Sequence, residues 1–130
     1  MLAAQDLGLN TWWIGGTFSR RVAVRVSGAT GRIVAVVALG YGATQGSAHV
    51  SKRPEEISSY DGEAPDWFTR GVEAALLAPT AFGKQAFTLS GRGGEVTLRC
   101  EDSAYAGQDR GLVKYHFEMG AGRDNFTWAH

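Results

Sequence analysis

Two adjacent cations, Lys52 and Arg53, are the residues whose types and spacing best suit ligand chemistry in this chain. They lie in a glycine-rich stretch, residues 40–54, that we expect to form a surface loop. A guanidinium beside an ammonium on such a loop suits a phosphate group, because both donate charge-assisted hydrogen bonds. Alternatively, both cations are solvated and pair with the neighbouring Glu55 and Glu56.

A glycine pair, Gly15-Gly16, is the second candidate for ligand contact, and it follows Trp12, Trp13 and Ile14. Two residues without a Cβ allow a ligand or another backbone to approach closely. Alternatively, the glycines only make a strand-to-helix turn, and both tryptophans lie in the core.

The third candidate is the segment at residues 79–85, where Thr80 and Gln85 carry side chains that form hydrogen bonds. Pro79 would end the preceding helix. Alternatively, Pro79 simply stops that helix and Thr80 caps a turn, without any contact to a ligand.

We expect the other reactive side chains, Cys100 and His116, to have structural roles. Cys100 is the single cysteine, so the chain cannot form an internal disulfide or a cysteine zinc site, and we expect a strand residue without a catalytic role. We expect His116 to be packed and hydrogen-bonded on the last helix. We therefore predict no metal site.

Composition excludes several classes of function. The 130 residues include 13 basic and 13 acidic residues, so no global field attracts nucleic acid or anionic membranes. The longest apolar run, residues 33–39, is far shorter than the roughly 20 residues of a membrane span, and the N-terminus lacks the basic flank of a signal peptide. We therefore expect a cytoplasmic protein with a small-molecule partner, without a nucleic-acid or membrane partner.

The pattern of apolar residues and breakers predicts an α+β fold, with helices packed on a mixed or antiparallel sheet. The expected helices are residues 1–8 ending at Gly8, 19–26 capped by Ser19, a short helix near Pro54, one from Pro65-Asp66 to Pro79, and 111–119. The expected strands are residues 9–14, a hairpin of 87–90 and 95–99 turning at 91–94, residues 126–128, and a central strand at 33–39, buried on both faces.

Several segments together resemble nitroreductase-like flavoproteins, most closely the C-terminal half of an internally duplicated, TM-type member. The run at residues 2–16 is similar to the stretch that ends a core helix and enters a strand under the flavin ring. Residues 79–85 resemble the family's proline-serine/threonine-x-x-asparagine-x-glutamine segment, with Gly83 in the asparagine position. Further similar stretches are residues 39–42, 71–80 and 109–118.

The resemblance implies an FMN enzyme that takes hydride from NAD(P)H and reduces nitro compounds, quinones or similar acceptors. It implies three sets of cofactor-binding residues: Trp13, Ile14, Gly15 and Gly16 beside the flavin ring; Lys52 and Arg53 on the phosphate; and Pro79, Thr80 and Gln85 reaching over from a partner subunit or from the other half of a tandem. It assigns no catalytic residue of the chain's own, because the cofactor carries the redox chemistry.

We expect residues 1–130 to form a single nitroreductase-like domain, an incomplete unit equivalent to the C-terminal portion. The family's arginine-arginine-serine segment has no counterpart here, so the expected partner is the missing N-terminal half or another copy of the chain. The sequence leaves open whether the chain is a gene fragment or a subunit, and whether it catalyses alone. An alternative function is a non-catalytic association module that oligomerises through apolar surface around Trp12, Trp13 and Trp128.

Overall fold

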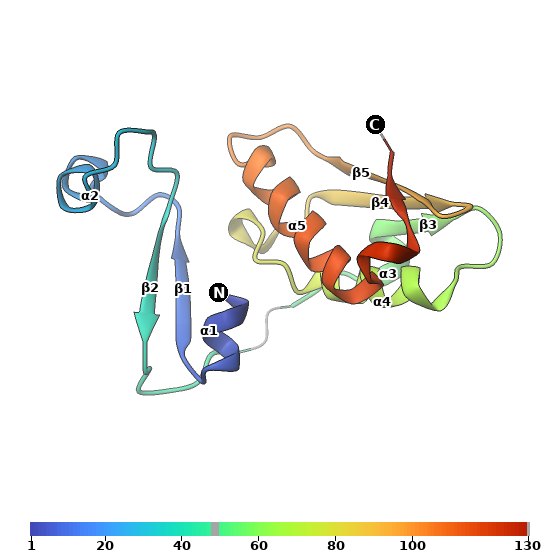
Figure 1. Cartoon of the computed structure of the whole chain (residues 1–130), viewed down its shortest axis with the longest axis horizontal. Helices are drawn as coiled ribbons and strands as arrows, with labels where there is room; N and C mark the ends of the chain where they lie inside the picture. The colour runs from blue at the N-terminus through green and yellow to red at the C-terminus, as the bar shows by residue number, and fades with distance from the viewer. Residues whose placement is uncertain (48–49, 130) are drawn as a thin grey trace. The chain divides into compact units, whose positions relative to one another are not determined.

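The computed structural model describes residues 1–47 and 50–129 and divides the chain into two compact units, residues 1–48 and 49–130. Both units contain helices and paired strands, so the predicted α+β class is confirmed (Figure 1). The prediction of a single domain over residues 1–130 stays a prediction.

The first unit is built around an antiparallel strand pair, in which Trp13 lies opposite Val37. Its elements are α1 (Leu2–Asp6), β1 (Asn10–Ile14), α2 (Arg20–Ser27) and β2 (Val36–Gly40). Helix α1 ends at Asp6, and the glycine predicted to stop it, Gly8, lies in the turn that follows. Its φ of +70° lets the Leu9 N–H reach the Ala4 carbonyl oxygen at 2.9 Å. This turn leads the chain directly into β1.

Strand β2 differs from the central strand, buried on both faces, that the apolar run at residues 33–39 predicts. The strand begins at Val36, and the side chains of Val37 and Leu39 are 46% and 62% exposed. Among the described residues β2 is hydrogen-bonded only to β1. The prediction was wrong because a β-branched run indicates strand propensity but not how many layers cover the strand.

The second unit packs helices against a four-stranded mixed sheet of order β3-β4-β5-β6 (Figure 1). Strands β4 and β5 are antiparallel, and each outer strand is parallel to its neighbour. The elements are α3 (Pro54–Ile57), β3 (Ser58–Tyr60), α4 (Asp66–Leu76), β4 (Phe87–Arg92), β5 (Glu95–Cys100), α5 (Ala106–Ala121) and β6 (Thr127–Trp128), with short 3-10 turns η1 (Ala81–Gly83) and η2 (Arg123–Asn125).

The hairpin between β4 and β5 is confirmed. Its two turn residues, Gly93 and Gly94, have φ values of +53° and +89°, which a two-residue turn with left-handed positions requires. Side chains of β4 alternate between buried and exposed, so one face of the sheet meets the helices.

Close contact between α4 and α5 forms the core of the second unit. Phe117 of α5 is completely buried, and Gly71 of α4 leaves the space that its ring fills. Helix α5 begins at Ala106, five residues before the predicted start at Gly111. The glycines of its first turns have low helix propensity, so the sequence signal for these turns is weak. Packing of Val113 and Phe117 onto the core stabilises the longer helix.

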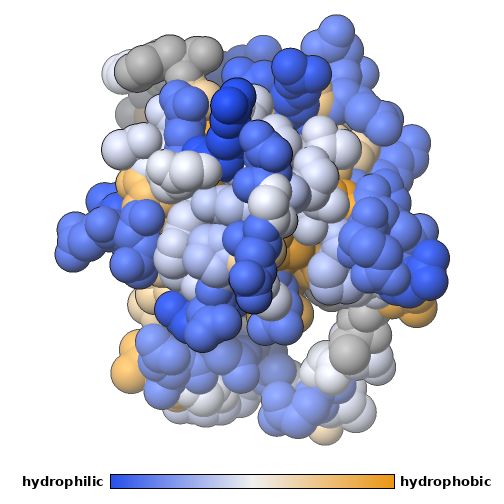
Figure 2. Space-filling model, turned by 90° about the vertical axis from the view of Figure 1, so that its right-hand side faces the viewer, coloured by the Kyte–Doolittle hydropathy of each residue, from blue (hydrophilic) through white to orange (hydrophobic). Residues whose placement is uncertain are grey.

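The surface seen from the right-hand side of Figure 1 is mostly hydrophilic, with scattered apolar residues (Figure 2). None of the helices in the described residues is long and apolar enough to cross a membrane. The cytoplasmic location expected from the sequence stays a prediction.

Candidate functional site

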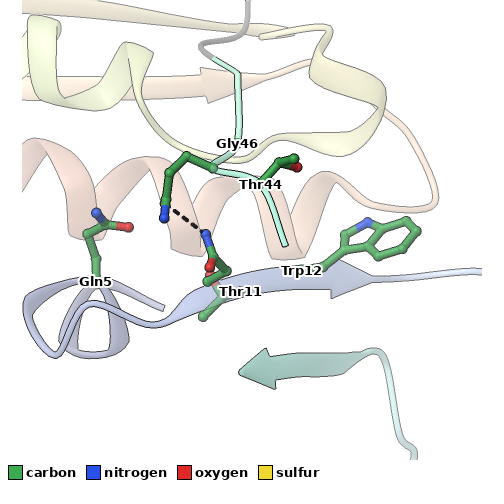
Figure 3. Close-up of a pocket in the computed structure, with 7 residues that line it drawn as sticks. Gln5, Thr11, Trp12, Thr44 and Gly46 are labelled. Atoms are coloured by element: carbon green, nitrogen blue, oxygen red, sulfur yellow. Dashed lines mark hydrogen bonds between the residues drawn. The ribbon is translucent and has the colours of Figure 1, made fainter. Parts of the chain in front are cut away.

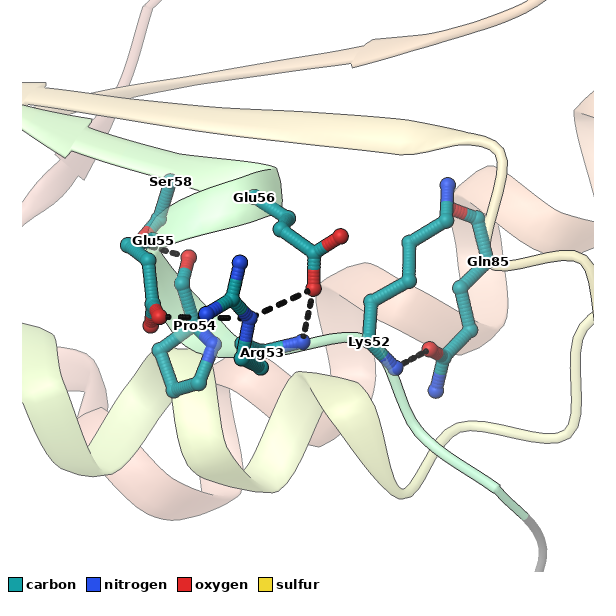
Figure 4. Close-up of polar contacts among 7 residues, drawn as sticks. All are labelled: Lys52, Arg53, Pro54, Glu55, Glu56, Ser58 and Gln85. Carbon is teal, nitrogen blue, oxygen red and sulfur yellow. Dashed lines mark hydrogen bonds and ion pairs between the residues drawn. The ribbon is translucent and has the colours of Figure 1, made fainter.

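The basic pair lies on the segment before α3, and Gln85 fixes its first member. The Lys52 N–H donates to Gln85 Oε1 at 2.7 Å, and Lys52 Nζ donates to the Gln85 carbonyl oxygen at 3.0 Å (Figure 4). Both bonds join residues 33 positions apart in the sequence. The loop that carries the cations is therefore attached to the segment after α4.

Gln85 is buried, with 1% of its surface exposed. Its Nε2 donates to the Leu76 carbonyl oxygen at 2.8 Å and to Ser51 Oγ at 3.3 Å. Burial of an amide is tolerated only when its polar atoms are bonded, which these contacts achieve. The side chain therefore bridges the end of α4 and the basic segment.

Arg53 has a side chain that is 72% exposed, and it lies beside two carboxylates. Its Nε is 3.4 Å from Glu55 Oε1 and 3.3 Å from Glu56 Oε2, as the solvated-charge alternative expects for this residue. The Arg53 N–H also donates to Glu56 Oε2 at 2.7 Å. The hydrogen bond from the Arg53 backbone, followed by that from its side chain, lowers the pKa of Glu56.

Residues 79–85 form a tight turn after α4. Thr80, 7% exposed, accepts the Gln85 N–H on its Oγ1 at 3.0 Å, so these two predicted contact residues bond to each other. The Ala81 N–H donates to Asp109 Oδ1 at 3.0 Å, which ties the turn to α5. Phe82 has a φ of +55° and is 84% exposed, a combination that is costly for a residue other than glycine.

The structure thus brings together the basic pair and the 79–85 turn, which the sequence treated as separate segments. The other predicted set lies in the first unit, where Trp13 and Ile14 end β1 and are partly buried, and Gly15 and Gly16 follow the strand.

The first unit also contains an open pocket of about 540 Å³ (Figure 3). Asn10 organises its wall, because its Nδ2 donates to Gln45 Oε1 at 3.1 Å and its Oδ1 accepts the Gly42 N–H at 2.7 Å. The lining residues are uncharged: Gln5, Asn10, Thr11, Trp12, Thr44, Gln45 and Gly46. A phosphate would find no counter-charge in this lining.

The two other reactive residues, His116 and Cys100, are packed within the second unit. Desolvation lowers the pKa of His116, which is half-buried and forms a hydrogen bond with the Ala74 backbone, as predicted for a packed histidine. Desolvation raises the pKa of the Cys100 thiol, so it is less reactive than a free thiol. Among the described residues, no cluster of histidine, cysteine and carboxylate side chains forms a metal site.

Sequence reasoning missed three partners in this site: Ser51, Asp109 and the carbonyl oxygen of Leu76. Ser51 and Asp109 are ordinary polar residues of a loop and a helix, and a backbone carbonyl carries no sequence signal at all. Pro79 gave an indirect signal, since the helix that it follows must leave carbonyl groups that need donors.

Comparison with known proteins gives one family and one solved fold. The family model described as "Putative TM nitroreductase" matches residues 1–121. The crystal structure of a putative nitroreductase from Thermotoga maritima matches with a TM-score of 0.73 and 20% sequence identity, covering 95% of this chain and 50% of that chain. This chain thus spans half the length of the solved relative, and the likeness shows the fold. No curated protein matches the chain.

Proposed function

Because the chain belongs to the "Putative TM nitroreductase" family, as the sequence resemblance indicated, we propose that it serves an FMN-dependent, NAD(P)H-linked reduction of nitro compounds, quinones or similar acceptors. We propose the same nine residues as its cofactor-binding residues, either by touching the cofactor or by shaping the site around it: Trp13, Ile14, Gly15, Gly16, Lys52, Arg53, Pro79, Thr80 and Gln85. We also propose that another copy of the chain, or a second nitroreductase half, completes the site. The family match does not favour the alternative of a non-catalytic association module.

The observation that supports this proposal most directly is the attachment of Lys52 to Gln85. The resemblance assigns both segments to flavin binding, with residues 79–85 reaching over from a partner subunit or the other half of a tandem. Here the two segments of one chain are joined by hydrogen bonds of 2.7 and 3.0 Å. A lysine that was merely solvated would not need its ammonium bonded to the backbone of a buried residue. The anchor supports a binding role for the segment.

The donors of this segment fit a phosphate group. In the described part of the chain, one of the three N–H groups of the Lys52 ammonium donates to Gln85, and the Arg53 guanidinium is largely exposed. The opposing contacts are the carboxylates of Glu55 and Glu56. Exposed ion pairs of this kind contribute only about 0–1 kcal/mol, whereas guanidinium and ammonium bonds to phosphate are charge-assisted and shorter. A phosphate can therefore compete for Arg53.

When bound, FMN would supply the redox chemistry by accepting hydride from the nicotinamide and passing electrons to the acceptor. The chain's own residues would bind the cofactor and orient it. Lys52 and Arg53 would hold the phosphate, and backbone N–H groups at Ile14, Gly15 and Gly16 would hydrogen-bond the ring. Thr80 and Gln85 would keep the 79–85 turn in shape beside the cofactor.

The test is an FMN titration of the purified 130-residue chain, followed by quenching of flavin fluorescence. The Lys52→Ala/Arg53→Ala variant removes the proposed phosphate contacts. A matched control, Arg92→Ala/Arg99→Ala, removes two positive charges from exposed positions of the β4–β5 hairpin. We expect saturable binding that is lost in the first variant and kept in the control, together with NAD(P)H oxidation when a nitro compound or quinone is added.

Two outcomes contradict the proposal. Equal loss of binding in both double variants would mean that net charge, not this site, attracts the flavin. No saturable binding to the wild-type chain and no NAD(P)H oxidation, even when a second nitroreductase half is co-expressed with it, would remove the flavin enzyme as its function.

A further inference from the structure

Gln85 uses both its side chain and its backbone to hold Lys52. Its Oε1 accepts the Lys52 N–H, and its carbonyl oxygen accepts Lys52 Nζ (Figure 4). One residue therefore fixes the backbone of Lys52 and the end of its side chain at the same time. The direction of the lysine side chain follows from Gln85.

The anchor is itself rigidly held. Gln85 Nε2 donates to the carbonyl oxygen of Leu76, in the last turn of α4, and the Gln85 N–H donates to Thr80 Oγ1. These contacts maintain a backbone φ of +47°, which is unfavourable for a residue with a side chain. A strained conformation persists only when its surroundings determine it, and here they direct the side chain at residues 51–52.

We propose that Gln85 is a positioning residue, which acts by holding Lys52 so that Lys52 and Arg53 present their cationic groups together to the cofactor's phosphate. This inference rests on the proposed function. It differs from the direct flavin contact implied by the family resemblance, because the amide of Gln85 is buried and bonded to the chain itself.

The test separates phosphate binding from ring binding by comparing FMN with riboflavin, which has the same ring but no phosphate. The ratio of the riboflavin Kd to the FMN Kd measures what the phosphate contributes. In Gln85→Met the side chain keeps nearly the same length but loses all of its hydrogen bonds. We expect the ratio to fall roughly ten- to a hundredfold, as loss of a hydrogen bond to a charged group causes, while the riboflavin Kd stays unchanged.

Gln85→Asn is the second variant, for the case that Gln85→Met does not fold. Asparagine tolerates a positive φ better than most residues, but its shorter side chain cannot reach both Leu76 and Lys52. We expect the same fall in the ratio. Gln108→Met, on α5, is the matched control and should leave both Kd values unchanged. Circular dichroism checks that each variant is folded.

Three results would overturn the inference. A folded Gln85 variant that keeps the wild-type ratio would show that the anchor does not position the cations. An equal rise in the Kd of both flavins would indicate a direct ring contact or a general structural role. A wild-type chain that binds neither flavin, even when a second nitroreductase half is co-expressed with it, would instead refute the proposed function, on which the inference rests. The wild-type titration alone identifies this outcome.

Discussion

Two glycines of the same helix, Gly111 and Gly120, should respond to alanine in opposite directions. A Cβ at Gly111 would meet no atom within 4 Å, whereas a Cβ at Gly120 would lie 2.4 Å from the carbonyl oxygen of Arg70 and 2.6 Å from Ala74 Cβ. The first position is open, and the second is where α5 touches the backbone of α4. Comparing the two alanine variants therefore separates the effect of packing from the effect of helix propensity on stability.

The magnitudes follow from these distances. At Gly111, alanine should stabilise the helix by roughly 0.5–1 kcal/mol, because glycine loses more backbone entropy on folding. At Gly120 the same gain is opposed by overpacking, typically about 1–3 kcal/mol, and a backbone oxygen cannot rotate away. With an overpacking cost of about 3 kcal/mol and a gain of about 1 kcal/mol from replacing glycine in the helix, Gly120→Ala should lower the free energy of unfolding by about 2 kcal/mol.

Hydrogen exchange of α5 amides measures this loss locally, which matters because the chain has two units and need not unfold in one step. Since about 1.4 kcal/mol corresponds to a tenfold change, protection of buried amides such as Phe117 should rise roughly two- to fivefold in Gly111→Ala. It should fall roughly 25-fold in Gly120→Ala. If the α5 amides are protected from exchange as strongly in Gly120→Ala as in Gly111→Ala, Gly120 is not in close contact with α4.

Three further perturbations test other parts of the second unit. Phe82→Gly should leave the free energy of unfolding unchanged or raise it by up to about 1 kcal/mol, because it relieves a left-handed backbone at an exposed side chain; a clear loss in urea denaturation would show that the Phe82 ring stabilises the turn. Glu118 should make stability depend on acid pH: desolvation acts to raise its pKa, but hydrogen bonds from Trp128 and Arg123 outweigh this and lower it. A lowered folded pKa adds stability above the unfolded value of about 4.3, and this is lost as pH falls through the folded pKa; Glu118→Gln should flatten that part of the pH profile, and an unchanged profile would contradict the assignment. Gly93→Val should destabilise the hairpin by about 1 kcal/mol or more, because a β-branched side chain disfavours positive φ, and exchange of the β4 and β5 amides would measure this.

Local patterns in the sequence predicted the elements that local chemistry determines. Gly8 turns the chain after α1, Ser19 caps α2 by accepting the Val22 N–H on its Oγ at 3.4 Å, and Gly93-Gly94 turns the hairpin. Each of these depends on residues a few positions apart, so one stretch of sequence contains the whole cause. The α+β class follows from the same signals.

Long-range partners decided the features that the sequence did not reveal. Strand β3 begins with two serines, which carry little strand propensity, and it pairs along the open edge of β4. The bond between Lys52 and Gln85 likewise joins distant positions. The sequence marked both residues as candidates, but only the fold explains how one holds the other.

The last strand has a consequence for the order of folding. Strand β6 pairs with the start of β5, and all of α5 lies between the two in the chain. Closing that long loop costs entropy that the β4–β5 hairpin does not have to overcome. The β4–β5 hairpin can therefore form early, and β6 should join the sheet only after α5 has docked, as the final step in assembling the unit.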